Sequence, residues 1–428
     1  MTGDRFIRRV PNLLAFGLTL HLVASPHALF SATWTVTTTA DQPGTSCGLP
    51  CSLRQAVEAA NASGGSNVIV FAVNGTFSLT VGSSLHVTGA PSQSVTLIGN
   101  GADSTVLDGG GITRVLDIDS GATVTVASLT IQHGNAGAGD GGGIRNLGTL
   151  TLSDALIKSN HASRGGGLSN SGGAVLQISN SSILDNSGDL GGGGIRNGTG
   201  STLTVTQSTI AGNRTDIVGG GIVSGPDSTL LVIGSTISGN SADGPGGGGG
   251  IASQAQAIVH NSTITGNTAV DHGGGIAIGA APVGTPGVLT LKNSVVSNNV
   301  VSGSGKGRDG GGINNGSTLI VDHSSIVDNA ARHDGGGIAN EGGAITTITK
   351  SLITGNTAGH DGGGITNELA GSPLNSVTLT DSTVSGNTAR HDGGGIFNSV
   401  GTVTLDRSTV TDNAPDNCSP SGGVPGCD

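Results

Sequence analysis

Short runs in which apolar and polar residues alternate recur along most of the chain. In the segment TLTVTQSTI, which begins at Thr202, Leu203 and Val205 fall on one side and the threonines on the other. A period of two residues is typical of β-strands. Because the repeated part shows no apolar period of 3.6 residues, we predict strands there and no helices.

The strands belong to a sequence repeat. From residue 141 onward Gly-Gly-Gly-Ile or Gly-Gly-Gly-Leu occurs ten times, and its last residues are Ile144, Leu168, Ile195, Ile222, Ile251, Ile276, Ile313, Ile338, Ile365 and Ile396. The intervals are 24 to 31 residues, apart from one of 37 before Ile313, where residues 301–309 suggest an inserted loop. A repeat of this length indicates a solenoid.

Each repeat contains three short strands separated by two or three turns. This content is that of one coil of a right-handed parallel β-helix, in which neighbouring coils pair at about 4.8 Å. We therefore predict an all-β fold, with a parallel β-helix of roughly 14 coils over residues 67–413 and a length of about 65 Å.

In such a stack each residue lies above its equivalent in the neighbouring coil, so repeated positions become ladders. An apolar ladder inside the coil is expected at Ile338, Ile365 and Ile396. Equivalent corners carry Asn329, Asn356 and Asn387, and a second Asn column follows two residues after the isoleucines. Since Asn tolerates a left-handed conformation and its amide can bond the amide above it, we predict structural Asn ladders. The glycines are expected where φ is positive or two backbones pass closely.

The first residues have the pattern of a secretory signal peptide. Arg5, Arg8 and Arg9 precede an apolar run that is shorter than the roughly 20 residues of a membrane span. We predict a signal peptide over residues 1–32, cleaved near residues 24–32, with an uncleaved anchor as the alternative. The mature chain is expected to have no membrane span and to be secreted, extracellular or on the cell surface.

A cap is predicted over residues 33–66. It contains one helix, over residues 51–63, in which Ser52 and Gln55 form a capping box. A solenoid needs its open end covered, and this helix is suited to that role.

The four cysteines lie close to the two ends of the predicted solenoid. They form two local pairs, Cys47 with Cys51 and, in a tail over residues 414–428, Cys418 with Cys427. An even number of cysteines in an exported chain favours disulfides, and the long separation of the two pairs argues against one zinc site.

Composition narrows the range of functions. The chain has 80 glycines, no Tyr and only 2 % aromatic residues, so it offers little surface for stacking sugar rings. Its net charge is −11 and no basic run follows the first ten residues, which argues against a nucleic-acid partner.

Residues 51–61, CSLRQAVEAAN, resemble the Cys-Ser-Leu-Arg-Glu-Ala opening of secreted bacterial β-helix repeat proteins, with Gln55 in place of Glu. The segments NVIVF, VLDGGG and SLTIQHGNA and the GGGI-x-N units are similar to the same proteins. The repeats also resemble those of polymorphic outer membrane proteins, although Ile-x-Gly-Asn stands where that group has Phe-x-x-Asn. The resemblance implies a pectin-lyase-like β-helix on or outside the cell, a fold shared by polysaccharide lyases, glycoside hydrolases and adhesins.

A His-Asp motif before the three glycines is the most distinctive candidate site. The aspartates that directly precede the first Gly are Asp309, Asp334, Asp361 and Asp392, and three of them follow His333, His360 and His391. Stacking would place the carboxylates about 5 Å apart. We expect that a cation such as calcium bridges them, that Arg308, Arg332 and Arg390 neutralise them, or that they splay into water.

Two functions from different classes are consistent with the sequence. The preferred one is a non-enzymatic secreted or cell-surface rod with a structural, adhesive or fibre-forming role. Such a rod has no catalytic residues and no cofactor unless it binds calcium, and its partners are an extracellular glycan, a surface protein or the end of another copy. The alternative is a polysaccharide lyase or glycoside hydrolase, which requires clustered carboxyl groups in a groove. The Asp-His pair at Asp322 and His323 occupies variable columns of the repeat, which argues against a lyase site there.

Overall fold

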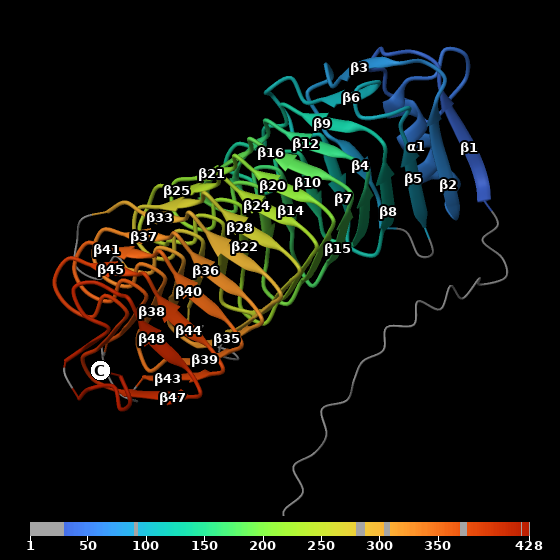
Figure 1. Cartoon of the computed structure of the whole chain (residues 1–428). Coiled ribbons are helices and arrows are strands. Elements are labelled where there is room, and N and C mark those ends of the chain that lie inside the picture. Colours follow the sequence, from blue (N-terminus) through green and yellow to red (C-terminus); the bar gives the residue numbers. More distant parts are fainter. Residues whose placement is uncertain are drawn as a thin grey trace, which may run out of the picture.

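A computed structural model describes residues 30–89, 93–279, 287–303, 309–368, 375–420 and 422–427. The chain forms an elongated stack of coils, with the only helix of the described residues at one end and the C-terminus at the other (Figure 1). Strands of successive coils pair in parallel and form four long sheets. Nearly all of the predicted signal peptide lies outside the described residues.

Sheet A has fourteen strands among the described residues. They are β1 (Phe30–Val36), β2 (Ser66–Phe71), β5 (Ser94–Ile98), β8 (Thr123–Ala127), β11 (Thr149–Ser153), β15 (Val175–Ser179), β19 (Thr202–Thr206), β23 (Thr229–Ile233), β27 (Gln256–His260), β31 (Val288–Lys292), β35 (Thr318–Asp322), β39 (Ile345–Thr349), β43 (Ser376–Thr380) and β47 (Thr402–Asp406).

Sheet B has thirteen strands in the same described ranges. They are β3 (Gly75–Ser78), β6 (Thr105–Asp108), β9 (Thr130–Gln132), β12 (Leu156–Lys158), β16 (Ser182–Leu184), β20 (Thr209–Ala211), β24 (Thr236–Ser238), β28 (Thr263–Thr265), β32 (Val295–Ser297), β36 (Ser325–Val327), β40 (Leu352–Thr354), β44 (Thr383–Ser385) and β48 (Thr409–Thr411).

Sheet C also has thirteen strands in the described part, and ten of them, β10 to β46, begin at the Gly-Gly-Gly-Ile or Gly-Gly-Gly-Leu corner. They are β4 (Leu85–Val87), β7 (Leu116–Ile118), β10 (Ile144–Asn146), β14 (Leu168–Asn170), β18 (Ile195–Asn197), β22 (Ile222–Ser224), β26 (Ile251–Ser253), β30 (Ile276–Ile278), β34 (Ile313–Asn315), β38 (Ile338–Asn340), β42 (Ile365–Asn367), β46 (Ile396–Asn398) and β49 (Cys418–Ser419).

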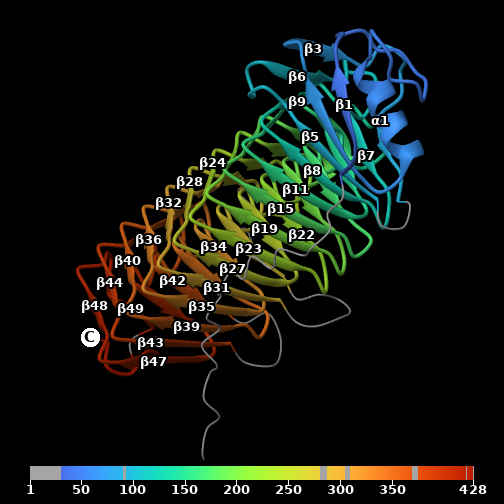
Figure 2. The same ribbon diagram turned by 90° about the vertical axis from the view of Figure 1, so that its right-hand side faces the viewer.

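A fourth sheet, D, differs from the predicted three strands per coil. Its strands, nine among the described residues, are β13 (His161–Arg164), β17 (Ser187–Gly191), β21 (Arg214–Thr215), β25 (Ser241–Ala242), β29 (Thr268–Ala269), β33 (Val300–Val301), β37 (Ala330–Ala331), β41 (Thr357–Ala358) and β45 (Thr388–Ala389). From β11 to β46 each coil runs from sheet A through B and D to C, whereas within the described residues the coils before β11 and the last coil have no sheet D strand. Figure 2 shows the coils stacked along the rod. Most sheet D strands have only two residues. Such strands are too short to show an alternating pattern in the sequence.

The interior of the stack is filled by the predicted apolar columns. Leu203 and Val205 are fully buried, as are Ile338, Ile365 and Ile396, which pair with one another in register along sheet C. Dispersion and hydrophobic burial by stacked aliphatic side chains thus replace the aromatic core that this composition lacks.

Both predicted Asn ladders are present. Asn329 Nδ2 donates to Asn356 Oδ1 (3.0 Å), and Asn356 Nδ2 donates to Asn387 Oδ1 (2.9 Å). The second ladder follows sheet C from Asn315 through Asn340 and Asn367 to Asn398. The expected left-handed conformation lies one residue earlier than predicted, at Asp328, Gly355 and Gly386, with φ of 54°, 66° and 64°. The residue before each Asn therefore makes the turn, and the backbone N–H of the Asn donates to the Asn side chain of the next coil.

The three glycines of each corner serve two different purposes. At the first, Gly335, φ is +66°, a conformation that favours glycine. At the third, Gly337, an added Cβ would lie 2.6 Å from the carbonyl oxygen of Gly364 in the next coil. The first glycine permits the turn and the later ones permit the close approach of two coils.

Helix α1 (Leu53–Ser63) closes the N-terminal end. Ser52 caps it by accepting the N–H of Gln55 (3.1 Å), while the Gln55 side chain accepts the N–H of Ser52 (2.9 Å), as the capping-box prediction requires. The helix packs against β1, β2 and β4. Strand β1 joins sheet A ahead of the predicted solenoid boundary at residue 67. Within the described ranges no helix has the length and apolar character needed to cross a membrane.

Both predicted disulfides are formed, between Cys47 and Cys51 and between Cys418 and Cys427. The second one lies in the tail, whose strand β49 pairs with β46 and so continues sheet C past residue 413. Val424 of the tail is buried. The tail therefore covers part of the last coil.

Candidate functional site

Carboxyl groups approach one stretch of sheet C from both of its edges. Asp309, Asp334 and Asp361 lie at the corners that lead into β34, β38 and β42. On the opposite edge, Glu341 follows β38 directly and Glu368 follows β42. We refer to these five residues as the carboxyl cluster. Because the intervening strands are only three residues long, side chains from the two edges can meet over the outer face of the sheet.

The aspartates form a ladder that uses the backbone of the next coil. Asp309 Oδ1 accepts the N–H of Asp334 (3.0 Å), Asp334 Oδ1 accepts that of Asp361 (2.7 Å), and Asp361 Oδ1 accepts that of Asp392 (3.0 Å). The first three aspartates are only 3 to 6 % exposed, whereas Asp392 at the last of these corners is exposed. The carboxylates of Asp309, Asp334 and Asp361 therefore do not splay into water.

Histidines, rather than the expected arginines, pair with the aspartate ladder. His333 Nδ1 lies 2.5 Å from Asp334 Oδ2, and His360 Nδ1 lies 2.9 Å from Asp361 Oδ2 and 3.3 Å from Asp334 Oδ1. Among the described ion pairs none joins Arg332 or Arg390 to the ladder, and Arg308 lies outside the described residues. The expected neutralisation by Arg332 and Arg390 is therefore not observed.

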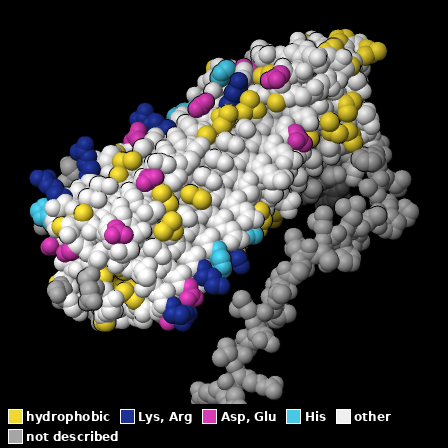
Figure 3. All heavy atoms as spheres, viewed as in Figure 1, with side chains coloured by type: hydrophobic (Ala, Val, Ile, Leu, Met, Phe, Trp, Pro, Cys, Tyr) yellow, Lys and Arg dark blue, Asp and Glu magenta, His cyan; other side chains and the backbone are white. Residues whose placement is uncertain are grey.

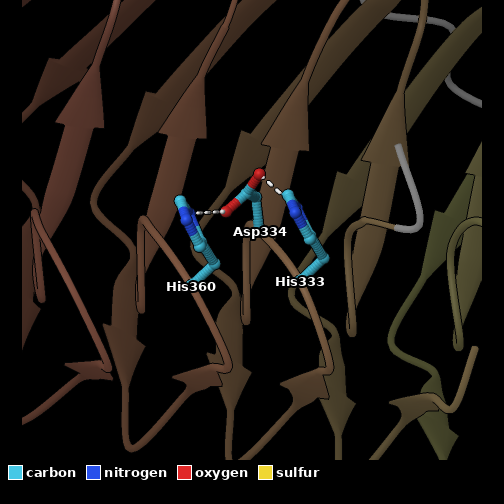
Figure 4. A group of neighbouring side chains, drawn as sticks. All are labelled: His333, Asp334 and His360. Carbon is cyan, nitrogen blue, oxygen red and sulfur yellow. Dashed lines mark ion pairs between the residues drawn. The ribbon is translucent and has the colours of Figure 1, made fainter. Parts of the chain in front are cut away.

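The imidazole rings form a stack of their own. The rings of His333 and His360 are nearly parallel, 3° apart with centroids at 4.9 Å, and those of His360 and His391 are 4.3 Å apart. Figure 4 shows the carboxylate of Asp334 between the nitrogen-bearing edges of the first two rings. A calcium ladder through all four aspartates stays a prediction. Each inner carboxylate already accepts a backbone N–H with one of its oxygens.

Glu341 and Asp309 form the most perturbed acid pair of the cluster. Burial, followed by the hydrogen bond and the negative charge of Asp309, raises the pKa of Glu341 to about 8. Burial also raises the pKa of Asp309. Asp309 is buried and Glu341 is partly buried. Two such carboxyl groups in contact cannot both ionise cheaply, so the pair retains a proton at neutral pH.

Glu368 is a second perturbed carboxyl group. Burial, together with the negative charges of Asp334, Asp309 and Asp361, raises its pKa to about 7. It lies one coil beyond Glu341, since the residues before them, Asn340 and Asn367, are paired in register. The same edge of sheet C therefore carries two acids with unequal proton affinities.

A pocket of about 240 Å³ adjoins the cluster on the outer side of sheet C. Side chains of β22, β26 and β30 line it, among them Val223, Ala252 and Ala277, and it ends at Asn314 on β34. Asn314 also contacts the carboxyl group of Glu341. Asn314 thus lies between the pocket and Glu341.

The sequence analysis found the aspartates and histidines of this site but missed its glutamates. Glu341 and Glu368 are the only glutamates in the repeats, and both follow the Asn of sheet C directly. Their equivalent positions in two successive repeats could have indicated that the two glutamates lie next to each other. The pairing across the strand could not be predicted, because the two carboxyl groups come from different edges and different coils.

The parallel coils and the following matches define the class of protein. Residues 110–285 match the family model described as right handed beta helix region. The predicted right-handed parallel β-helix is thereby confirmed.

The chain is similar to several solved structures at low sequence identity. A catalytic-domain variant of a GH87 alpha-1,3-glucanase in complex with tetrasaccharides is 10 % identical, with 93 % of this chain and 70 % of that chain covered and a TM-score of 0.52. A pectate lyase is 13 % identical, with 91 % and 82 % covered and a TM-score of 0.41. A mannuronic acid specific family 6 polysaccharide lyase from human gut microbiota is 10 % identical, with 88 % and 86 % covered and a TM-score of 0.43. No curated protein sequence matches the chain.

Proposed function

We propose that this chain is a secreted glycoside hydrolase that cleaves an extracellular polysaccharide on the outer face of sheet C. The observation that carries the proposal is the pair of buried Asp309 and partly buried Glu341, which a pocket adjoins through Asn314. Hydrolysis of a glycosidic bond needs a carboxylic acid that still holds its proton when the substrate binds. Glu341, with a pKa of about 8, meets this requirement at neutral pH.

Glu368 supplies the second carboxyl group. Its pKa of about 7 is below that of Glu341, so it ionises first as the pH rises. Neighbouring coils are about 4.8 Å apart, which is close to the roughly 5–5.5 Å between the two carboxyl groups of retaining enzymes. We therefore assign Glu341 as general acid and Glu368 as nucleophile, with retention of configuration.

A lyase is less consistent with this site. Elimination by a lyase needs an unprotonated base and a cation that neutralises the sugar carboxylate, and among the described ion pairs none joins a Lys or Arg side chain to the carboxyl cluster. The glucanase that shares this fold acts on a polysaccharide, which guides the choice of substrates to test.

The test is the release of reducing ends from a panel of insoluble and soluble polysaccharides that includes α-1,3-glucan and pectate. Glu341→Gln and Glu368→Gln should each lower the rate of hydrolysis at least about 100-fold, because a positioned acid or base typically accelerates a reaction by at least that factor. Glu58→Gln, on helix α1 at the far end of the rod, is the matched control and should keep full activity. An inactive wild type across the panel, or an active Glu341→Gln variant, would refute the assignment.

A second candidate is the non-enzymatic rod, with an adhesive or structural role outside the cell. Much of the face in Figure 3 carries no charged side chain, and Lys and Arg stand along its edges. Such a face suits contact with a neutral glycan or another protein. This candidate predicts that the wild type sediments with a polysaccharide without releasing reducing ends, and that Glu341→Gln binds equally well.

A further inference from the structure

We propose that His333, Asp334 and His360 form a binding site for one transition-metal dication of the zinc type. One ligand atom from each of these residues lies within 4.8 Å of the others. The three residues come from two successive coils, at the corners before β38 and β42. The proposed ligands differ from the proposed catalytic groups, because neither Glu341 nor Glu368 is among them.

Asp334 is held in place to offer one oxygen. Its Oδ1 atom accepts the N–H of Asp361 at 2.7 Å, which fixes the carboxylate plane. Its Oδ2 atom faces His333 Nδ1 at 2.5 Å. Only 4 % of the Asp334 side chain is exposed. A ligand positioned by a backbone hydrogen bond is the arrangement that metal sites commonly use.

The two histidines offer nitrogen atoms that have no hydrogen bond. Nδ1 of His333 and Nδ1 of His360 are buried, and neither makes a hydrogen bond within the described structure, although both lie within 3.3 Å of the carboxylate. Because neither nitrogen is engaged in an aligned hydrogen bond, each can bind a metal ion when its imidazole is neutral. Zn–N bonds of 2.0–2.1 Å in a tetrahedral site would bring the nitrogens to about 3.3 Å apart, which requires the rings to tilt toward each other.

The surroundings allow that tilt and favour a cation. His333 is 21 % and His360 is 43 % exposed, so the rings can rotate and water can complete the coordination. Asp309, Asp361 and Glu368 surround the site with carboxyl groups. Bringing a dication into this cluster would relieve their mutual repulsion.

The donor set selects the metal. Calcium prefers six to eight oxygen atoms, whereas two imidazole nitrogens and one carboxylate suit zinc, cobalt or nickel. The candidate metal thus changes from calcium, expected from aspartates alone, to a nitrogen-seeking ion. His323 does not form the same set of two imidazoles and one carboxylate. Its Nδ1 atom lies 2.6 Å from Asp322 Oδ1, but no second histidine joins this pair among the described ion pairs.

The test is calorimetric titration of the chelator-treated full chain with zinc, with cobalt as a spectroscopic probe. We expect one ion per chain, a cobalt spectrum with the intense visible bands of tetrahedral nitrogen and oxygen coordination, and no displacement by a large excess of calcium. His333→Ala and His360→Ala should each weaken zinc binding at least about tenfold. His323→Ala is the matched control and should bind as the wild type does.

Three results would overturn the site: no zinc binding by the wild type, an equal loss in His323→Ala, or displacement of zinc by calcium. Glu341→Gln should keep zinc affinity, which separates failure of this site from failure of the hydrolase proposal. Circular dichroism of each variant shows whether its coils remain folded. If a variant unfolds, the cobalt spectrum of the wild type alone still decides whether nitrogen ligands bind the metal.

Discussion

Asn356 shows how one buried side chain joins three coils. Its Nδ2 atom donates to Asn387 Oδ1 (2.9 Å) and to the carbonyl of Ile326 (2.9 Å). Its Oδ1 atom accepts both the backbone N–H and the Nδ2 of Asn329, each at 3.0 Å. The residue is fully buried, so no water can replace these bonds. The ladder is therefore a continuous chain of polar contacts along the rod.

Replacing Asn356 with Ala should strongly destabilise the protein. Buried donors and acceptors on both neighbouring coils would lose their partners, at a cost of about 3 kcal/mol or more. The measurement is the midpoint of denaturant unfolding. Asn413→Ala is the control, because Asn413 lies in the last coil and is partly exposed, so its loss should cost less. Equal midpoints for the two variants would contradict the ladder's role.

At the scale of elements, sequence columns predicted which positions stack but not how the corners are built. Ile338 and Asn340 repeat often enough to show the interior and one corner of sheet C. Sheet D was missed because Ala330–Ala331 is too short to alternate. The sequence predicted a positive φ at Asn329, but the structure has it at Asp328. Asn and Asp both tolerate this conformation, so the residue types alone could not distinguish the two positions.

Strand β49 gives a prediction about the C-terminal end. A chain that stops after Asn413 would lose the pairing of β49 with β46 and the cover of Val424 over the core. An uncovered edge and open core favour association between copies. Light scattering should therefore show larger particles for the shortened chain than for the full chain at equal concentration. Identical masses would show that the tail does not protect this end.

At the scale of the whole molecule, the carboxyl cluster should make stability depend on pH. The pKa of Glu341 rises from 4.5 to about 8, with Asp309, Asn314 and Glu368 facing it. The folded protein therefore binds this proton more tightly than the unfolded chain, and the stabilisation that is complete below about pH 4.5 is lost as the pH rises through 8.

The difference between the wild type and Glu341→Gln isolates this effect. The two unfolding temperatures should be similar at pH 4, and the wild type should fall progressively below the variant between about pH 4.5 and pH 8. Glu58→Gln controls for the substitution itself, because helix α1 lies outside the cluster. A constant difference between the wild type and Glu341→Gln at all pH values would contradict burial of this carboxyl group.

Long-range geometry explains why the site was harder to predict than the fold. The fold follows from local repetition, which a single sequence displays openly. The site joins Asp309 to Glu341 across a strand and one coil, and His333 to His360 across a coil. Such contacts depend on the register between coils and on the direction of the side chains, and a single sequence specifies neither of them directly.

The central claim is that Glu341 holds a proton at neutral pH on the outer face of sheet C. The chain has only three glutamates, Glu58, Glu341 and Glu368, so labelling glutamate with ¹³C at the carboxyl carbon gives three resonances that the Glu→Gln variants assign. We predict that the Glu341 signal titrates near pH 8 and the Glu368 signal near pH 7. Titration of the Glu341 carboxyl group near its ordinary value of about 4.3 would contradict the account.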